Sequence, residues 1–223
     1  YGNGIYDPIE NQQYGSRFDG SMVALGPELE DGDRQMVRYS PLKKEKHKFW
    51  NNGLTIQNDV SFSTQDFYMS FQNVQIKGMM PGDERKRTNF RFNASKEYNR
   101  FRASFNINYI QDNYDVVNEA AYVGRFASTY NGSIYFAILN TPAHVPITSY
   151  KDWRNDKYSQ YGNYYNEYAS NPYWIIDNHR SRGRESNLLG SLDLGYTIAP
   201  WLAATFRLGS NFRFETTKSE IAP

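Results

Sequence analysis

Residue types that carry catalysis occur in this chain, but none is spaced for a recognisable reaction. The three histidines, at positions 47, 144 and 179, lack the His-x-x-x-His spacing of a zinc site, and there is no Cys. The Gly-x-Ser-x-Gly motif that presents a nucleophilic serine does not occur either. Asp152 and Asp156 have the chemistry of a glycosidase pair, yet Arg154 and Lys157 beside them favour solvated ion pairs. The sequence therefore predicts no enzyme and no cofactor.

One run of acidic residues is a candidate metal site. Glu30-Asp31-Gly32-Asp33 carries the carboxylate oxygens that Ca²⁺ prefers, but it lacks the ligand spacing of an EF-hand. Asp and Gly in such a run are also typical of a solvated turn, which is the interpretation we favour. We expect no metal centre, with Ca²⁺ near Asp31 or Asp33 as the alternative.

A tract of aromatic residues is the strongest candidate for binding. Flat rings can stack on a sugar, grip a peptide or form a protein interface, and they can equally pack against one another within a loop. All of these uses stay open from the sequence. The residues are Tyr158, Tyr161, Tyr164, Tyr165, Tyr168, Tyr173 and Trp174.

Strict alternation over residues 101–109 identifies the elements that would position these side chains. Every odd position there is apolar or aromatic and every even one is polar. Successive side chains of a β-strand point to opposite faces, so the segment has one apolar and one polar face. The same pattern predicts six strands in all, at 54–63, 67–76 (with a bulge near Asn73), 89–98, 101–110, 188–198 and 202–214.

The connections between these strands alternate in length. Three are tight turns, whereas 77–87 and 111–186 are long. The longest is predicted to be partly helical, with one helix over 115–127 capped by Asp115 and another over 133–139. Tight turns at one end and long loops at the other are typical of outer-membrane barrels. In such a barrel four arginines on the polar face would point into the lumen: Arg91, Arg102, Arg207 and Arg213.

The composition agrees with a barrel wall. Nineteen Tyr, fourteen Phe and four Trp make the 223-residue chain 17% aromatic, although its mean hydropathy is −0.78. A lipid-facing surface combined with a wet lumen and polar loops accounts for both values. The 25 basic and 24 acidic residues leave no basic excess for nucleic-acid binding. The sequence contains no run of eighteen apolar residues, so it predicts no membrane-spanning helix.

Several motifs resemble, in order and spacing, those of SusC/RagA-type TonB-dependent transporters. The similarity covers most of residues 14–210. The motifs are Tyr14-Gly15-Ser16-Arg17-Phe18-Asp19-Gly20, Phe49-Trp50-Asn51-Asn52-Gly53, Asn140-Thr141-Pro142, Asn171-Pro172-Tyr173-Trp174 and Leu189-Gly190-Ser191-Leu192.

The resemblance implies an all-β fold, an antiparallel transmembrane β-barrel segment with long, partly helical extracellular loops. Because a plugged barrel needs about 22 strands, six would be an excerpt of a larger plugged barrel. Residues 1–53 would be an extracellular region after the plug and first strand, and 54–110 and 187–215 barrel strands. Residues 111–186 would form a long extracellular loop, and 216–223 would begin the next one.

The implied function is import of large nutrients, glycans or oligopeptides, across the outer membrane of a Gram-negative cell. A SusD-like surface lipoprotein would cover the mouth, TonB would supply energy through a segment outside these residues, and lipid would surround the wall. The four arginines would tune the field of the lumen or pair with the plug. No nucleic acid is expected as a partner.

Two other classes stay open. A soluble β-sandwich binding module or a surface adhesin would also have strands of alternating apolar and polar residues, and either could display the aromatic tract. A sandwich predicts that the 223 residues fold alone in water with a cooperative melt, whereas a barrel segment predicts aggregation without lipid.

Overall fold

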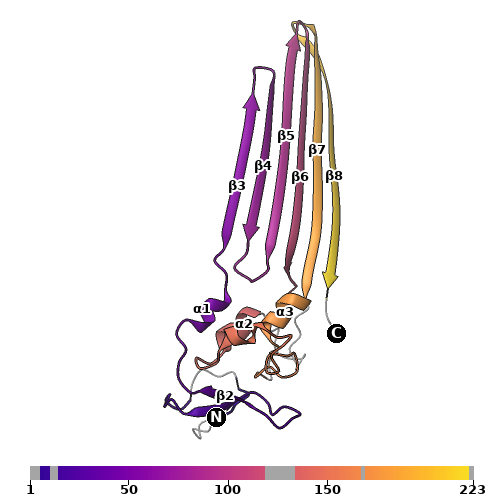
Figure 1. The fold of residues 1–223 in the computed structure, drawn as a ribbon. Coiled ribbons are helices and arrows are strands. Elements are labelled where there is room, and N and C mark those ends of the chain that lie inside the picture. The colour runs from indigo at the N-terminus through magenta and orange to yellow at the C-terminus, as the bar shows by residue number, and fades with distance from the viewer. Residues whose placement is uncertain (1–5, 11–14, 119–133, 167–168, 221–223) are drawn as a thin grey trace.

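The structure is a computed structural model that describes residues 6–10, 15–118, 134–166 and 169–220. One six-stranded antiparallel sheet dominates it, with strands in chain order from β3 to β8 (Figure 1). The strands are β3 (Leu54–Ser63), β4 (Phe67–Lys77), β5 (Glu84–Tyr98), β6 (Phe101–Val117), β7 (Arg180–Ala199) and β8 (Leu202–Glu220). The sheet is open, because among the described residues β3 and β8 each pair with one neighbour only. The all-β class is confirmed, and the described strands do not form a closed barrel.

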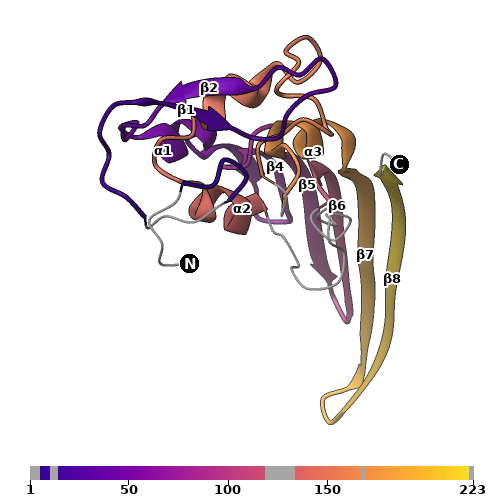
Figure 2. The same ribbon diagram turned by 90° about the horizontal axis from the view of Figure 1, so that it is seen from below.

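A second unit lies at one end of the sheet. We call it the cap, and it consists of the described residues of 6–53 and 134–179. Figure 2 shows its helices and its small hairpin gathered over the strand ends. Its elements are β1 (Met22–Leu25), β2 (Gln35–Arg38), α1 (Glu45–Phe49), α2 (Ile134–Asn140), the 3₁₀ helix η2 (Ile147–Lys151) and α3 (Pro172–Asn178). Within the described parts of the chain, no helix has the length and hydropathy needed to cross a membrane.

The buried core lies in the cap and not in the sheet. The described buried hydrophobic side chains form one cluster, to which the strands and their turns contribute only Met80 and Val117, at the cap border. Tyr150, Tyr165 and Ile147 have no exposed surface at all. The sheet thus has no core of its own, although a sheet normally needs a covered apolar face for independent stability.

The predicted strands are confirmed, but four of them are longer than the apolar pattern indicated by five residues or more, and β4 is longer by one. β3 coincides with the prediction, whereas β5 to β8 continue toward the cap through charged residues. These extensions are held by cross-strand ion pairs such as Arg85 with Asp112 at 2.5 Å. The loops predicted at 77–87 and 111–186 are correspondingly shorter, and only 78–83 and 118–179 connect the strands.

Two further local predictions are wrong. The bulge near Asn73 does not form, since Asn73 pairs in continuous register with Asn58 on one side and Thr88 on the other. Asp115 does not cap a helix, because β6 runs to Val117 and the Asp115 carboxylate accepts hydrogen bonds from two arginines of β7. The rest of that predicted helix lies outside the described residues.

Two predictions about the rest of the chain can be compared with the cap. The helix expected over 133–139 is confirmed as α2. The region expected as loop over 1–53 instead contains β1, β2 and α1, whose side chains Leu25 and Phe49 belong to the buried core. The described part of this region is therefore half of a folded unit.

Candidate functional site

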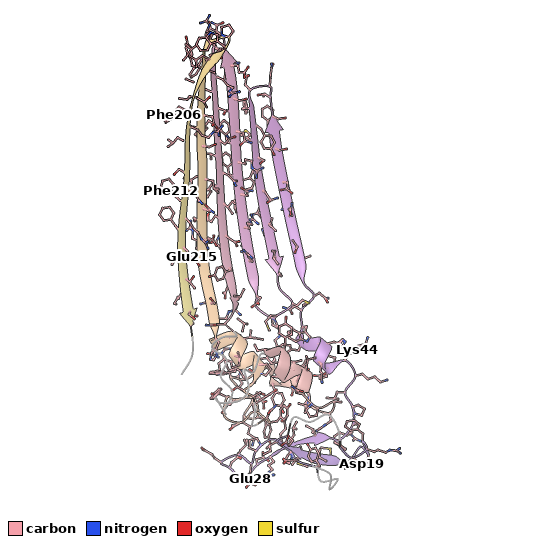
Figure 3. All side chains as sticks on the ribbon, turned by 180° about the vertical axis from the view of Figure 1, so that it is seen from behind. Asp19, Glu28, Lys44, Phe206, Phe212 and Glu215 are labelled. Carbon is pink, nitrogen blue, oxygen red and sulfur yellow. The ribbon has the colours of Figure 1, made fainter. Side chains whose placement is uncertain are left out.

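One face of the sheet is apolar and uncovered. Register places Phe71, Phe90, Tyr109, Leu188 and Phe212 in one row across five strands. Further rows toward the tight turns carry the same kind of side chain, and Figure 3 shows Phe206 and Phe212 projecting from β8. Many of these side chains are exposed, such as Phe90 at 37%, Phe212 at 54% and Val60 at 70%, whereas Tyr109 is half-buried. We call this surface the apolar band. Its other members are Phe62, Phe67, Met69, Phe92, Phe101, Phe105, Ile107, Leu192, Leu194, Tyr196, Leu208 and Phe214.

The height of the apolar band matches a membrane. The band covers nine consecutive positions of β6 (101–109), or about 27 Å along the strand, and thirteen of β8 (202–214), or about 41 Å. For strands tilted by about 35–45°, these lengths correspond to a band roughly 20–30 Å tall, against about 25 Å for outer-membrane barrels. At the tight-turn edge lie Tyr98, 72% exposed, and Trp201, 83% exposed. Aromatic side chains at such an edge are typical of a membrane interface.

The opposite face is polar, and it carries all four arginines that the sequence assigned to it. Arg91 is opposite Asn108, Arg102 opposite Gly195, Arg207 opposite Asp193 and Arg213 opposite Asn187, all on the face that the apolar band does not occupy. Arg207 pairs with Asp193, and Arg213 lies 3.0 Å from Glu185.

A shallow concavity of about 530 Å³ lies in the middle of this polar face. Its lining includes Arg91, Asn93, Asn106, Ser191 and Asn211. Three amide oxygens of the same face, on Asn89, Asn108 and Asn187, are buried without a hydrogen-bond partner among the described residues. Buried amide oxygens are normally paired. These oxygens can accept hydrogen bonds from a group that packs against this face; the sequence had identified only the arginines of the face as candidates, and not these amides.

The aromatic tract mostly packs within the cap. Tyr164, Tyr165, Tyr173 and Trp174 are all at least nine-tenths buried. Burial raises the pKa of Tyr165 and of Tyr173 to about 12. A buried ring cannot stack on a sugar or a partner protein. Among the alternatives, self-packing is the one the structure supports for these four residues.

Two tract residues lie at the surface of the cap. Tyr161 is 47% exposed, with its ring 4.3 Å from that of Trp174, and the Tyr158 hydroxyl donates to Asp33 at 2.8 Å. Tyr168 lies outside the described residues. Tyr161 is consequently the one member described here that a partner could contact over much of its ring.

The candidate calcium ligands hold a side-chain cation. The Lys157 ammonium lies 3.1 Å from Asp31 and 2.5 Å from Asp33. The pKa of the Asp33 carboxyl lies below its usual range, mainly because Lys157 donates a hydrogen bond to it. Among the described residues, no cluster of three or more potential metal ligands forms.

The two cations expected to pair with Asp152 and Asp156 have other partners. Arg154 pairs with Asp177 at 3.0 Å, and Lys157 pairs with Asp31 and Asp33.

A buried arginine joins the cap to the sheet. Arg180 is only 5% exposed, and its guanidinium donates from Nε to Asp115 at 2.7 Å. Its other nitrogens donate to the carbonyls of Gly82 at 2.7 Å and Ile176 at 3.3 Å. One side chain therefore holds the β4–β5 turn, α3 and β6 together. Sequence reasoning missed this residue because its partners are up to 98 positions away.

The Asn-Pro motif has a structural role in the cap. Asn171 is the N-cap of α3, and its side chain accepts from the amide of Tyr173 at 3.0 Å. Its amide nitrogen donates to the carbonyls of Tyr150 at 2.8 Å and Ser159 at 2.6 Å. The motif is a buried hub that fixes three segments of the cap.

No protein-family model matches this chain, and no curated protein matches it at a significant level. The two faces of the sheet and the cap are therefore the features that bear on function.

Proposed function

We propose that these residues form part of the wall of an outer-membrane transporter of the SusC/RagA type, which imports a glycan or oligopeptide through a plugged barrel. The observation that carries the proposal is the apolar band. A long sheet face that is exposed in every strand and about as tall as a membrane core requires a cover, and lipid acyl chains supply one of that height.

The edges of the sheet support the same conclusion. β3 and β8 are long strands whose outer edges are unpaired in the described structure. Open edges are not tolerated in a membrane, because unpaired backbone groups there have no water to bind. We propose that further strands pair with both edges and close the wall.

The connections set the orientation of the wall. The turns at 64–66, 99–100 and 200–201 are short, whereas the cap extends from the opposite end of the sheet. In outer-membrane barrels short turns face the periplasm and large loops face outward. The cap would then lie at the cell surface, where a SusD-like lipoprotein could contact it, and TonB would act from the other side.

The polar face would line the lumen. Arg91, Arg102 and the concavity that Arg91 lines would meet the plug or the substrate, and the three unpaired amide oxygens would find donors there.

Membrane fractionation with one substituted pair tests the proposal. In cells that express the full-length gene product, the protein should sediment with the outer membrane and resist extraction by alkali. Phe206→Arg places a charge on the apolar band, and we expect a penalty of about 2–4 kcal/mol and a sharp fall in assembled protein. Thr205→Arg, one residue away on the polar face, should assemble normally.

Recovery of the wild-type protein in the soluble fraction would contradict the proposal and favour the β-sandwich or adhesin. Equal effects of the two substitutions would show that the faces do not differ in environment.

A further inference from the structure

A row of basic side chains crosses the membrane-facing side just above the apolar band. Lys86 on β5 is opposite Asn113 on β6, and Asn113 is opposite Arg184 on β7. Lys86 has the same parity as Phe90, and Arg184 the same as Leu188, so both cations lie on the face of the apolar band. We call Lys86, Asn113 and Arg184 the basic row.

The charges of the basic row are not neutralised within the described structure. Arg184 donates to the neutral side-chain amide of Gln111 at 2.7 Å, but no carboxylate of a described residue lies within ion-pair distance of Lys86 or Arg184, and both residues are exposed. On the other face, at similar height, Arg85 and Arg213 pair with Asp112 and Glu185, whereas Arg87 has no ion pair with a described residue. The wall therefore has spare positive charge on the side that faces lipid.

The height of the basic row coincides with lipid headgroups. It lies two residues beyond Phe214 and four beyond Phe90 when followed along the strands. At ~3.4 Å per residue and a tilt of about 45°, this places it roughly 5–10 Å above the band. The headgroup region begins at the edge of the acyl core and is about 5–8 Å thick. Neighbouring strands are about 4.8 Å apart, so Lys86 and Arg184 are about 10 Å apart at the backbone and can converge on one phosphate.

We infer that the basic row binds the phosphate of an anionic lipid headgroup in the outer leaflet. The inference rests on the proposed function, because it needs the apolar band to face lipid. Ammonium and guanidinium groups both bind phosphate, the guanidinium in bidentate fashion. A cation near an anionic membrane surface changes lipid association about fivefold. The row would select charged lipids for the ring around this part of the wall.

The test uses a fluorophore at the centre of the row. Asn113→Cys gives a labelling site in a segment without other cysteines, and Asn113 is exposed between the two cations. The labelled full-length protein is placed in phosphatidylcholine nanodiscs. Phospholipids with a nitroxide at the top of the acyl chain are then titrated in, either with an anionic phosphatidylglycerol headgroup or with a zwitterionic phosphatidylcholine one.

We expect the anionic lipid to quench at a lower mole fraction than the zwitterionic one. Lys86→Gln and Arg184→Gln should each reduce this preference about fivefold, and high salt should weaken it. Arg87→Gln is the matched control, because Arg87 is the next residue of β5, also exposed, but on the polar face. It should leave the preference unchanged.

The outcomes separate the inference from the proposed function. Equal quenching by the two lipids, or equal effects of Lys86→Gln and Arg87→Gln, would overturn the inference while leaving the wall in the membrane. Quenching by neither lipid would show that this face does not meet lipid, and the proposed function would fall with it.

Discussion

Arg180 offers a test of how the cap is attached to the sheet. Arg180→Met keeps the length of the side chain but removes a buried guanidinium that donates to Asp115 and to two backbone carbonyls. It also leaves Asp83, 3.6 Å away, without its cation. Burial already raises the pKa of Asp83, so this carboxylate has little solvent to replace the lost partner. Loss of one partner of a buried pair costs about 3–5 kcal/mol, and we take the lower end because Asp115 is partly exposed.

Hydrogen exchange detected by mass spectrometry measures this cost in the full-length protein in micelles. About 3 kcal/mol corresponds to roughly 150-fold faster exchange of the amides in α3 and in the 78–83 turn. The control is Arg182→Met, which also removes a donor to Asp115 but from a side chain that is 47% exposed. A surface pair contributes about 0–1 kcal/mol, so exchange should rise fivefold at most. Similar exchange rates in the two variants would refute the claim that the buried Arg180 side chain holds the cap to the sheet.

Three further predictions concern the cap, each measurable as its thermal unfolding or hydrogen exchange. Gly26→Ala places a Cβ 2.9 Å from the Cα of Tyr165 at a φ of +82°, and should lower the free energy of unfolding by about 2–4 kcal/mol. Gly20→Ala is the control, because its φ is +76° but no atom lies within 4 Å of the added Cβ, and it should cost only about 1–2 kcal/mol. Burial lowers the pKa of His144 and of His179, so folding favours their neutral forms. The stability of the cap should therefore hold above pH ~6.5 and fall as the pH decreases below that value. A stability that does not change with pH in this range would contradict the prediction. Asn171→Ala should cost at least about 3 kcal/mol, and Asn171→Asp at least as much, because its buried carboxylate would face the carbonyls of Tyr150 and Ser159 to which the Asn171 amide donates; a clearly smaller loss for Asn171→Asp would show that these two bonds are unimportant.

The strands could be predicted because their signal is local. Alternation of side chains over about ten residues is a property of the strand itself, and it also put the four arginines on one face correctly. The strand ends could not be predicted in this way. In the segments 84–88 and 180–187 polar residues occupy both faces, and what continues the strand is pairing with distant partners, such as Arg85 with Asp112.

The cap could not be predicted because its contacts join segments far apart in the chain. Tyr150 donates to Gln35 at 2.6 Å, and the Glu45 carboxylate accepts from the amide of Thr148 at 3.0 Å. Composition alone does not distinguish an aromatic ring that packs inward from one that binds a ligand. The tyrosine tract was for that reason open from the sequence, and burial shows that most of it is core.

The most direct test of the account is whether the two faces of β8 meet different solvents. Single cysteines at Phe206, Arg207, Phe212 and Arg213 of the full-length protein, each carrying a nitroxide, can be compared in lipid bilayers by collision with oxygen and with a water-soluble nickel chelate. The account predicts alternation: residues 206 and 212 collide mainly with oxygen, which concentrates in lipid, while 207 and 213 are relatively more accessible to nickel. Nickel accessibility at 206 and 212 equal to that at 207 and 213 would contradict the claim that the apolar band faces the membrane.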